Sequence, residues 1–390
     1  ARAAREFTAF SRRTRRLWDA FREPVMDSAR PDPMRLAALV APRPRLLAAM
    51  APGRSLAALC ARSFSDPRLA QLFGRYATYV GGSPYRAPAL LSLIWQAEAE
   101  GVWVVEGGMH ALARAIADRI TDRGGQIRCN AHVGRILADS SGVTGVALTD
   151  GTILPADHVV FNGDPRALAT GHLGAAVAGI APQTATAPRS LSAQVWAFAA
   201  EASGLDLAHH NVFFSEDPRA DFAALEAGRL PDDTTLYLCA EDRGQGRAAP
   251  QVERFEIILN APPLSQRADG PQEYESCHTR TFPTLKRFGL TFSESPKPPA
   301  LTTASGFDAL FPASSGSLYG QSPHGLTAAL QRPTAKTAMP GLWLAGGGCH
   351  PGAGVPMAAT SGRHAAEAIL TGRTSTSPSR PTAKIGRAHV

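Results

Sequence analysis

Residues 341–357 read Gly341-Leu-Trp-Leu-Ala-Gly-Gly-Gly-Cys-His-Pro-Gly-Ala-Gly-Val-Pro-Met357, and the segment Ser361-Gly-Arg-His-Ala-Ala-Glu-Ala-Ile369 follows closely. The pattern predicts a short apolar strand from Leu342 to Ala345, a glycine-rich loop and then a helix. Glycines permit positive φ angles and let bare backbone N–H groups approach a ligand. The helix aims its free N–H groups and positive dipole end at the same loop, which suits an anion or an electron-rich heterocycle. The alternative is a tight connection that needs glycine only for its geometry.

The central part of the chain predicts a helix followed by strands and a hairpin. Gly107-Gly108 opens an amphipathic helix from Met109 to Arg123, and Gly124-Gly125 ends it. Strand-like runs follow, separated by turns at Ser140-Ser-Gly142 and Asp150-Gly151. These runs are Gln126 to Leu137, Val143 to Leu148 and Asp157 to Phe161, and the last ends at Asn162-Gly-Asp-Pro165.

Further motifs stand in the order found in one enzyme family. They are Arg75-Tyr-Ala-Thr-Tyr-Val-Gly-Gly-Ser-Pro84, Gly316-Ser-Leu-Tyr-Gly320 and the glycine-rich loop. With them, residues 1–372 resemble the phytoene-desaturase-type carotenoid desaturases, which bind FAD. Within that family the chain is most similar to the 1-hydroxycarotenoid 3,4-desaturases, also called methoxyneurosporene dehydrogenases. The closer resemblance rests on Arg189-Ser-Leu-Ser-Ala-Gln-Val-Trp-Ala-Phe198 and His209-His-Asn-Val-Phe-Phe214.

The resemblance implies a fold class and a division into domains. We expect an α/β fold with α+β character, in which a Rossmann-like FAD-binding domain lacks its first βαβ unit. A substrate domain with a mixed sheet and helices accompanies it. The FAD-binding domain is expected at residues 99–165 and 338–372, and the substrate domain at 1–98 and 166–337. Predicted strands of the substrate domain are Ala193 to Ala199, Asn211 to Phe214, Thr235 to Cys239 and Phe255 to Asn260.

Both ends of the chain predict a longer parent protein. Enzymes of this family begin with a strand, a Gly-x-Gly-x-x-Gly turn and a helix. That fingerprint is absent from the sequence, which starts at Ala1 without Met. We therefore expect an N-terminally truncated chain, which could be inactive by itself. Residues 373–390 predict a disordered tail, and its end, Ile385 to Val390, matches a translated sequencing adapter and is not expected to belong to the native fold.

Composition narrows the class of protein. A chain of 390 residues can bury a large core and hold more than one domain. Its five cysteines show no Cys-x-x-Cys spacing, which argues against a disulfide framework and for a reducing, cytoplasmic compartment. No apolar run reaches eighteen residues, so no membrane-spanning helix is expected. Cys349, in the glycine-rich loop, is expected to be a buried packing thiol.

The net charge of +7 is concentrated in residues 1–54, which carry twelve arginines and five acids. A basic amphipathic helix can lie on an anionic membrane. We prefer this interpretation, with peripheral membrane association, because a carotenoid must be collected from lipid. The alternative is a charged helix that packs by its aromatic side, and no motif supports nucleic-acid binding. The apolar stripe at helical spacing consists of Phe7, Phe10, Leu17, Trp18 and Phe21.

The resemblance also implies which residues bind FAD. Val133 would meet the adenine through its backbone, although any β-branched residue suits a buried strand. Asn162 and Asp164 end a strand where ligands gather in open α/β sheets, but as turn formers they need no ligand. The full set of cofactor-binding candidates is Val133, Asn162, Asp164, Gly346, Gly347, Gly348, Gly352, Gly354, Val355 and Pro356.

An acyclic carotenoid is the substrate that the resemblance implies. Trp196 and Tyr319 are candidates to line its channel, because aromatic faces suit a polyene, unless they are ordinary core residues. His209, His210 and Asn211 are candidates to bind a tertiary hydroxyl of the substrate. Their alternative is a strand end hydrogen-bonded to backbone. The histidine spacing fits no zinc motif and no third ligand is near in sequence, so no metal is expected.

The implied reaction removes two hydrogens from adjacent carbons, one as hydride to the flavin and one as a proton. Positive charge spread along the polyene acidifies the neighbouring C–H, so alignment over the flavin matters more than a strong base. Asp66, within Ser65-Asp-Pro-Arg-Leu69, is the candidate acid or base, although we favour helix capping for it. An electron acceptor must reoxidise the flavin, and the residues do not specify which.

Three functions are compatible with these residues. The first is FAD-dependent 3,4-desaturation of a 1-hydroxy or 1-methoxy carotenoid such as hydroxyneurosporene. The second is a related carotenoid reaction such as phytoene desaturation, against which the predicted hydroxyl-binding segment argues. The third is a non-catalytic, GDI-like lipid-escort protein, which has no need for an intact flavin loop. The intact Gly346-Gly-Gly348 and Pro351-Gly-Ala-Gly354 favour an enzyme.

Overall fold

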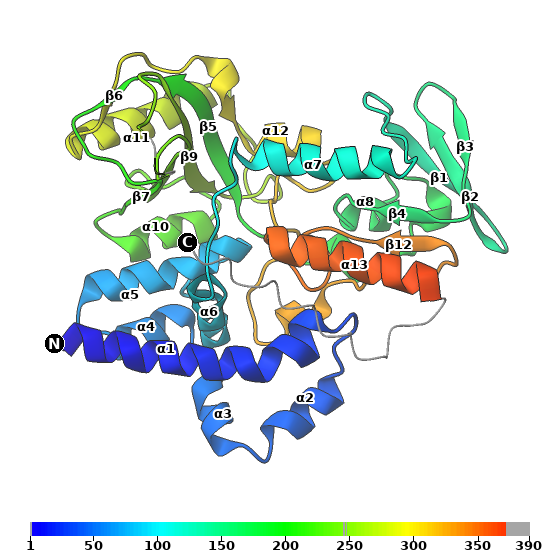
Figure 1. The fold of residues 1–390 in the computed structure, drawn as a ribbon, viewed down its shortest axis with the longest axis horizontal. Coiled ribbons are helices and arrows are strands. Elements are labelled where there is room, and N and C mark those ends of the chain that lie inside the picture. The colour runs from blue at the N-terminus through cyan, green and yellow to red at the C-terminus, as the bar shows by residue number, and fades with distance from the viewer. Residues whose placement is uncertain (1, 245, 247, 372–390) are drawn as a thin grey trace.

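The computed structural model describes residues 2–244, 246 and 248–371, and the predicted disordered tail, 373–390, lies outside them. Figure 1 shows three groups of elements. Helices form the N-terminal region, an antiparallel sheet packs beside α11 (Glu273–Arg287), and α13 (Val355–Thr371) lies next to two smaller sheets. None of the described helices is both long and apolar enough to cross a bilayer.

The N-terminal helices pack through apolar side chains. Phe10, Leu17 and Trp18 of the first helix are buried, whereas Arg12, Arg15 and Arg16 are exposed. The helices are α1 (Arg2–Phe21), α2 (Pro33–Val40), α3 (Pro44–Met50), α4 (Leu56–Ser63), α5 (Pro67–Gly74) and α6 (Ile94–Ala99). Shorter helical turns lie at Arg22–Asp27, Arg75–Val80 and Ala89–Leu93.

This packing corrects the membrane role predicted for the aromatic stripe of α1. The Phe10 ring lies 5.0 Å from that of Phe64 and 4.9 Å from that of Phe73, centre to centre. Leu17 and Trp18 join a second apolar cluster that includes Leu46 of α3. Burial against neighbouring helices removes four of the five stripe residues from water, as lipid would, and only Phe7 stays exposed, at 37%. The helix therefore packs by most of its aromatic side and presents its arginines to solvent, except Arg13, which is partly buried and donates to the Ala49 carbonyl oxygen.

The largest sheet has the strand order β11-β5-β9-β8-β7. All four strands predicted for the substrate domain are present in it. The predicted mixed sheet is wrong in direction, because each pairing is antiparallel. Strands β8 and β9 follow each other directly in the chain, whereas α10 (Pro218–Glu226) lies in the connection between β7 and β8. Antiparallel pairing allows such connections without the crossover that parallel pairing requires. Their bounds are β5 (Ser192–Ala200), β7 (His210–Phe213), β8 (Leu236–Ala240), β9 (Glu253–Ala261) and β11 (Leu301–Thr302).

Successive residues of each strand point to opposite faces of this sheet, and the two faces have different surroundings. Trp196, Leu238 and Ile257 lie in the buried core with residues of α11. Tyr237 and Glu256, next to them in sequence, are only partly buried and belong to the opposite face. Smaller elements complete this region: β6 (Ala202–Ser203), α10 (Pro218–Glu226), β10 (Thr291–Phe292), a turn at Pro298–Ala300, α12 (Ala304–Leu310) and a turn at Ala328–Gln331.

A three-stranded antiparallel sheet, β1-β2-β3, follows the predicted helix α7 (Met109–Asp122). The helix ends as predicted, with Gly124 at a φ of 81°. The strand predicted from Gln126 begins too early, because Asn130 adopts a left-handed turn at a φ of 55° and the ladder starts only at Val133. The elements are β1 (Val133–Asp139), β2 (Gly142–Leu148), β3 (Ile153–Pro155), β4 (Val159–Phe161), α8 (Arg166–Ala169), a turn at Ala175–Val177 and α9 (Gln183–Thr186). The short strand β3 was not predicted.

Parallel pairing joins the two halves of this region. Strand β12 (Leu342–Leu344) pairs with β4, and the Ala345 N–H extends the ladder to the Phe161 carbonyl oxygen at 3.0 Å. Parallel strands end at the same edge of a sheet. The pairing therefore brings the turn after β4 beside the glycine-rich loop after β12.

Candidate functional site

The glycine-rich loop connects β12 to α13, as predicted. Gly346, Gly352 and Gly354 have φ angles of 105°, 137° and 97°. Side chains other than hydrogen are strained at such angles. Gly347 and Gly348 do not share this conformation, so they need a different explanation.

Close packing explains two of the glycines. A Cβ atom on Gly346 would lie 2.5 Å from Asn162 Oδ1, and one on Gly348 would lie 2.8 Å from Cδ of Pro165. The Gly346 N–H also donates a hydrogen bond to the Ser361 hydroxyl of α13 at 2.7 Å. The structure thus brings the predicted residues Asn162, Gly346 and Gly348 together at one edge of the β4-β12 sheet.

The other side of the loop is open. A Cβ atom on Gly354 would meet no atom within 4 Å, and one on Gly347 would meet only the Ala353 Cα, at 3.9 Å. Helix α13 starts at Val355, which is exposed, and Pro356 has no N–H to satisfy. A planar heterocycle can therefore reach this backbone, and the positive end of the helix would stabilise negative charge on it. The residues present fit a flavin.

Arg332 supports the loop from within. Arg332 is only 7% exposed, and its Nη1 donates to the Gly347 carbonyl oxygen at 2.8 Å. Its Nη2 donates to the carbonyl oxygens of Tyr319 at 2.9 Å and Gln321 at 3.3 Å. Burial lowers the pKa of Arg332 to about 10, so the side chain stays charged at neutral pH. Cys349 nearby is fully buried, and burial raises its pKa to about 12, as expected of a packing thiol.

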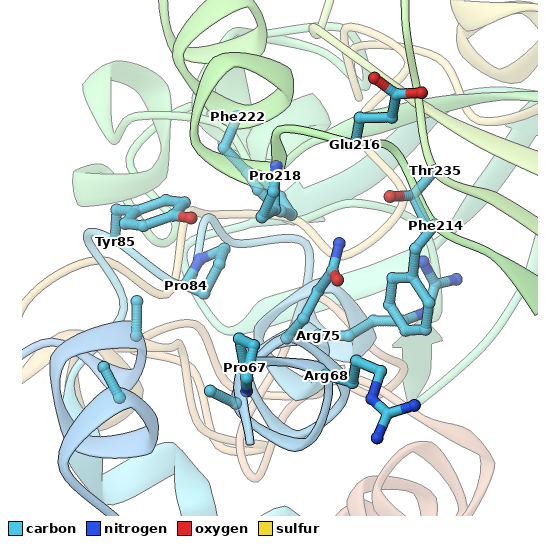
Figure 2. Close-up of a pocket in the computed structure, with 15 residues that line it drawn as sticks. Pro67, Arg68, Arg75, Pro84, Tyr85, Phe214, Glu216, Pro218, Phe222 and Thr235 are labelled. Atoms are coloured by element: carbon cyan, nitrogen blue, oxygen red, sulfur yellow. The ribbon is translucent and has the colours of Figure 1, made fainter. Parts of the chain in front are cut away.

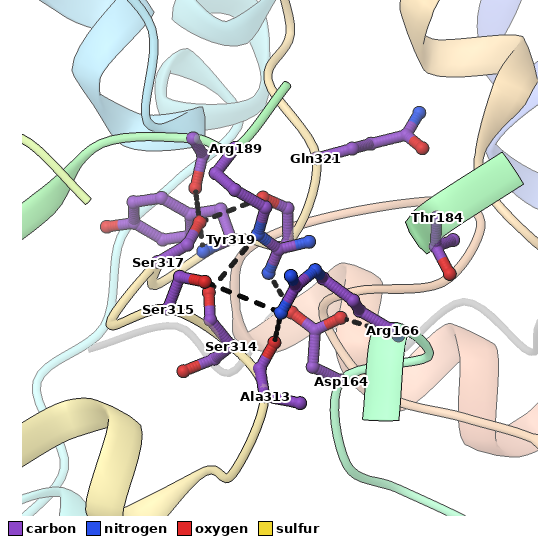
Figure 3. Close-up of polar contacts among 12 residues, drawn as sticks. Asp164, Arg166, Thr184, Arg189, Ala313, Ser314, Ser315, Ser317, Tyr319 and Gln321 are labelled. Carbon is purple, nitrogen blue, oxygen red and sulfur yellow. Dashed lines mark hydrogen bonds and ion pairs between the residues drawn. The ribbon is translucent and has the colours of Figure 1, made fainter. Parts of the chain in front are cut away.

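Asp164 forms a buried ion pair with Arg189 (Figure 3). The two side chains are only 7% and 4% exposed. Asp164 Oδ1 also accepts from the Arg166 N–H at 2.9 Å, and Arg166 Nη1 reaches the Ala313 carbonyl oxygen at 2.8 Å. Both carboxylate oxygens are therefore engaged by protein groups. This arrangement favours the alternative role of Asp164 as a turn former over direct contact with a cofactor.

Val133 and Asp164 line the same cavity, of about 320 Å³, together with Phe161 and Leu173. The fold therefore brings the predicted adenine contact next to the turn after β4. The role of the Val133 backbone in binding adenine stays a prediction.

A second cavity, of about 420 Å³, lies between α5, α10 and the largest sheet (Figure 2). Asp66 does not line it. The Asp66 carboxylate accepts from the Arg68 N–H at 3.0 Å and from Arg68 Nη2 at 2.7 Å, so the predicted capping role is confirmed. These hydrogen bonds lower the pKa of Asp66, which weakens it as a base. The mostly apolar lining includes Pro67, Arg68, Arg75, Pro84, Tyr85, Phe214 and Phe222.

Trp196 is a core residue and does not line a channel. It is fully buried, its Nε1 donates to Thr281 Oγ1 at 3.1 Å, and its ring lies 5.3 Å from that of Phe282. Its position on the strand turns it toward α11, which corrects the predicted substrate contact. Tyr319 is only partly buried, and its ring lies against Gly81, so it stays a candidate channel residue.

The histidine pair at the start of β7 makes contacts with the protein. His209 Nδ1 lies 2.9 Å from the Arg243 carbonyl oxygen, and His210 Nδ1 lies 2.7 Å from the Tyr237 hydroxyl. Asn211 is bonded at both ends of its amide to the backbone of Ala208. These contacts match the alternative of a strand end bonded to its surroundings, at least for His209 and Asn211.

The fold supplies a neighbour that the histidine spacing did not reveal. Cys239, opposite His210 on β8, lies with its Sγ 3.5 Å from His209 Nε2. The potential ligand atoms of His209, His210 and Cys239 lie within 4.8 Å of one another. A third potential metal ligand is therefore close to the two histidines in the folded protein, although none is close to them in the sequence. The expectation that no third ligand is nearby is wrong in this respect.

Comparison with known proteins defines the class. The profile of the flavin-containing amine oxidoreductases matches residues 8–197. The crystal structure of an oxidoreductase from Methanosarcina mazei aligns with a TM-score of 0.50 and 16% identity, over 86% of this chain and 71% of that one. The structural match concerns the fold alone. Together with the open glycine-rich loop, the profile defines a flavin-dependent oxidoreductase.

Closer relatives define the family. Hydroxyneurosporene desaturases are 56% identical in Cereibacter sphaeroides, 49% in Rhodobacter capsulatus and 43% in Rubrivivax gelatinosus. The matches cover 95%, 95% and 97% of this chain and 74%, 75% and 73% of those proteins. The chain belongs to this family of flavin oxidoreductases.

Sequence reasoning missed the buried arginines Arg189 and Arg332. Each is joined to its partners by contacts between segments far apart in the chain, so local periodicity carries no trace of them. One local signal concerns Arg332, which lies between Gln331 and Pro333 ahead of β12. A charged residue there does not belong to the exposed face of a helix, so its charge needs another explanation.

Proposed function

We propose that the protein is an FAD-dependent desaturase that introduces the 3,4 double bond into an acyclic 1-hydroxy or 1-methoxy carotenoid. The observation that carries this proposal is 43–56% identity to three hydroxyneurosporene desaturases over at least 95% of the chain. The open loop beside α13 supports an enzyme over an escort protein, because a lipid carrier needs no bare backbone at a helix N-terminus.

The chain's own residues would hold the cofactor and align the substrate. In this proposal residues 99–165 and 338–372 form the FAD-binding domain, and residues 1–98 and 166–337 form the substrate domain. A bound flavin supplies the two-electron acceptor that a desaturation requires. Gly347 and Gly354 would offer their backbone to it, and Arg332 would keep that backbone in place. Apolar walls would exclude water and fix the polyene, which is the main task when no strong base is needed.

We also infer peripheral association with a membrane, through arginines and not through the aromatic stripe of α1. Two cavities beside α1 and α3, of about 740 and 640 Å³, are lined by seven arginines: Arg12, Arg13, Arg15, Arg16, Arg43, Arg45 and Arg54. Two exposed apolar residues lie on the consecutive helices α2 and α3: Met34, which is 79% exposed, and Leu47. Exposed apolar residues among cations suit an anionic lipid surface. Salt-sensitive co-sedimentation with phosphatidylglycerol vesicles, but not with phosphatidylcholine vesicles, would support this inference.

The enzymatic proposal is tested with purified, flavin-loaded protein and 1-hydroxyneurosporene in the presence of an artificial electron acceptor. We expect a product whose absorption moves to longer wavelength, because one conjugated double bond is added. A flavoprotein that converts only another carotenoid would point to a different reaction of the family. Carotenoid binding without any bound flavin would support the escort alternative.

A further inference from the structure

Arg75 is a partly buried cation without an acidic partner. It follows α5, begins the helical turn Arg75–Val80 and lines the cavity of Figure 2. Within residues 2–244, 246 and 248–371, no carboxylate lies within 4.0 Å of its guanidinium and no acceptor is hydrogen-bonded to it. By contrast, Arg68 in the same cavity pairs with Asp66 at 2.7 Å. An unpaired buried donor is costly, which calls for a ligand or a structural reason.

Asp221 supplies no such structural reason. It is the acid that acts on Arg75 electrostatically, but it lies beyond ion-pair distance. Its Oδ2 accepts from the Thr235 N–H at 3.1 Å and from the Ser215 hydroxyl at 3.2 Å. Asp221, on α10, is therefore held through its Oδ2, and its Oδ1 is buried without a hydrogen-bond partner among the described residues. Neither oxygen reaches the guanidinium at ion-pair distance, so the Arg75 donors are left free.

The surroundings of Arg75 are aromatic. Its guanidinium carbon lies 5.8 Å from the centre of the Tyr237 ring. Tyr79 and Tyr319 also lie within electrostatic range of the cation. A guanidinium stacked among rings keeps its N–H groups available at the edge for an oxygen acceptor.

Arg75 lines this cavity, and Tyr319, which lies within its electrostatic range, connects it to the glycine-rich loop. The carbonyl oxygens of Tyr319 and Gly347 both accept hydrogen bonds from the Arg332 guanidinium. Gly320 packs so closely on the loop that an added Cβ would lie 3.1 Å from the Gly348 Cα. A substrate that runs from the loop into the cavity of Figure 2 would therefore pass the Arg75 side chain.

We propose that Arg75 binds the oxygen on C1 of the carotenoid end group and thereby sets the preference for an oxygenated substrate. This inference rests on the proposed function. Only two bonds separate C1 from C3, so a 3,4-desaturase must hold that oxygen close to the reacting carbons. Hydroxyl and methoxy oxygens both accept a hydrogen bond from a guanidinium. A hydrocarbon end group would leave the buried donors unpaired and be disfavoured.

The test compares kcat/KM for 1-hydroxyneurosporene and for neurosporene, which lacks the oxygen, in wild-type protein and in Arg75→Leu. We expect kcat/KM for the hydroxylated substrate to fall on the order of 100-fold, because a charged hydrogen bond is lost. The value for neurosporene should stay level or rise. Arg75→Gln, which keeps an N–H donor, should recover part of the preference and gives a second variant should Arg75→Leu not fold.

Arg62→Leu is the matched control, since Arg62 is exposed on α4 and lines neither cavity wall nor loop. It should leave the ratio of the two kcat/KM values unchanged. Flavin content and Tm of the Arg75 variants should equal those of wild type, because a merely structural arginine would lower both. An unchanged substrate ratio in a folded Arg75 variant overturns this inference alone. Wild-type protein that converts neither carotenoid overturns the proposed function instead.

Discussion

Arg332 Nη1 donates a hydrogen bond to the Gly347 carbonyl oxygen at 2.8 Å, so a buried cation stabilises the backbone of the glycine-rich loop. The same side chain holds the carbonyl oxygens of Tyr319 and Gln321. Three backbone acceptors from two segments thus depend on one residue. Because each would be costly to bury without a donor, the shape of the loop is set by a residue outside it.

Arg332→Met should therefore destabilise the protein and weaken flavin binding together. We expect the free energy of unfolding to fall by about 2–5 kcal/mol, since three buried carbonyl oxygens lose their donors. Arg332→Lys should be intermediate, because an ammonium cannot reproduce the planar fork. Thermal unfolding and flavin content measure both effects, with exposed Arg229→Met as the control. Wild-type values for Arg332→Met would contradict this role.

Gly347 and Gly348 form a matched pair that separates packing from cofactor binding. In Gly348→Ala the new Cβ would lie 2.8 Å from Pro165, so we expect a loss of about 1–3 kcal/mol of stability from overpacking. In Gly347→Ala the nearest atom is 3.9 Å away, so stability should hardly change. If the flavin approaches this backbone, Gly347→Ala should still weaken flavin binding, as titration of the apoprotein with FAD would detect. If both substitutions changed Tm equally, the assignment of packing to Gly348 and of cofactor binding to Gly347 would be wrong.

His350 should make stability depend on pH. Burial lowers its pKa to about 4 from the ordinary 6.5. Between these values the unfolded chain binds a proton that the folded protein does not, so the free energy of unfolding falls as pH drops from 6.5 toward 4. The slope should approach about 1.4 kcal/mol per pH unit. Urea unfolding at several pH values measures it. His350→Gln should make the curve shallower but not flat, because burial also lowers the pKa of His364, whereas exposed His110→Gln should leave the slope unchanged.

Trp196→Phe distinguishes a core residue from a channel residue. The substitution removes the hydrogen bond to Thr281 and part of the contact with Phe282. We expect a loss of about 1–3 kcal/mol of stability and an unchanged KM for the carotenoid. Trp103→Phe, at an exposed position, should change neither quantity. A raised KM with unaltered stability would restore the channel role.

Local patterns predicted the elements well, and long-range contacts explain what they missed. Alternating apolar residues were sufficient to find β5, β7, β8 and β9, and the glycines of the loop marked the turn between β12 and α13. The direction of the large sheet could not be predicted this way, because residues within one strand do not specify its neighbour.

The sequence likewise predicted some residues of the candidate site and missed others. Asn162 and Gly346 meet as expected from the ends of parallel strands. Arg75, Arg189 and Arg332 were missed, because their burial arises only when distant segments pack together. The apolar stripe of α1 illustrates the converse, since a helix face that suits lipid suits a protein core equally well.

The two faces of the largest sheet carry separate sets of residues with different tasks. Leu236, Leu238 and Ile257 secure the sheet from one side, while Tyr237 and Glu256, one residue along, belong to the other. Selection can therefore alter the second set without disturbing the first. Alternate positions of the same strands are thus free to diverge at little risk to folding.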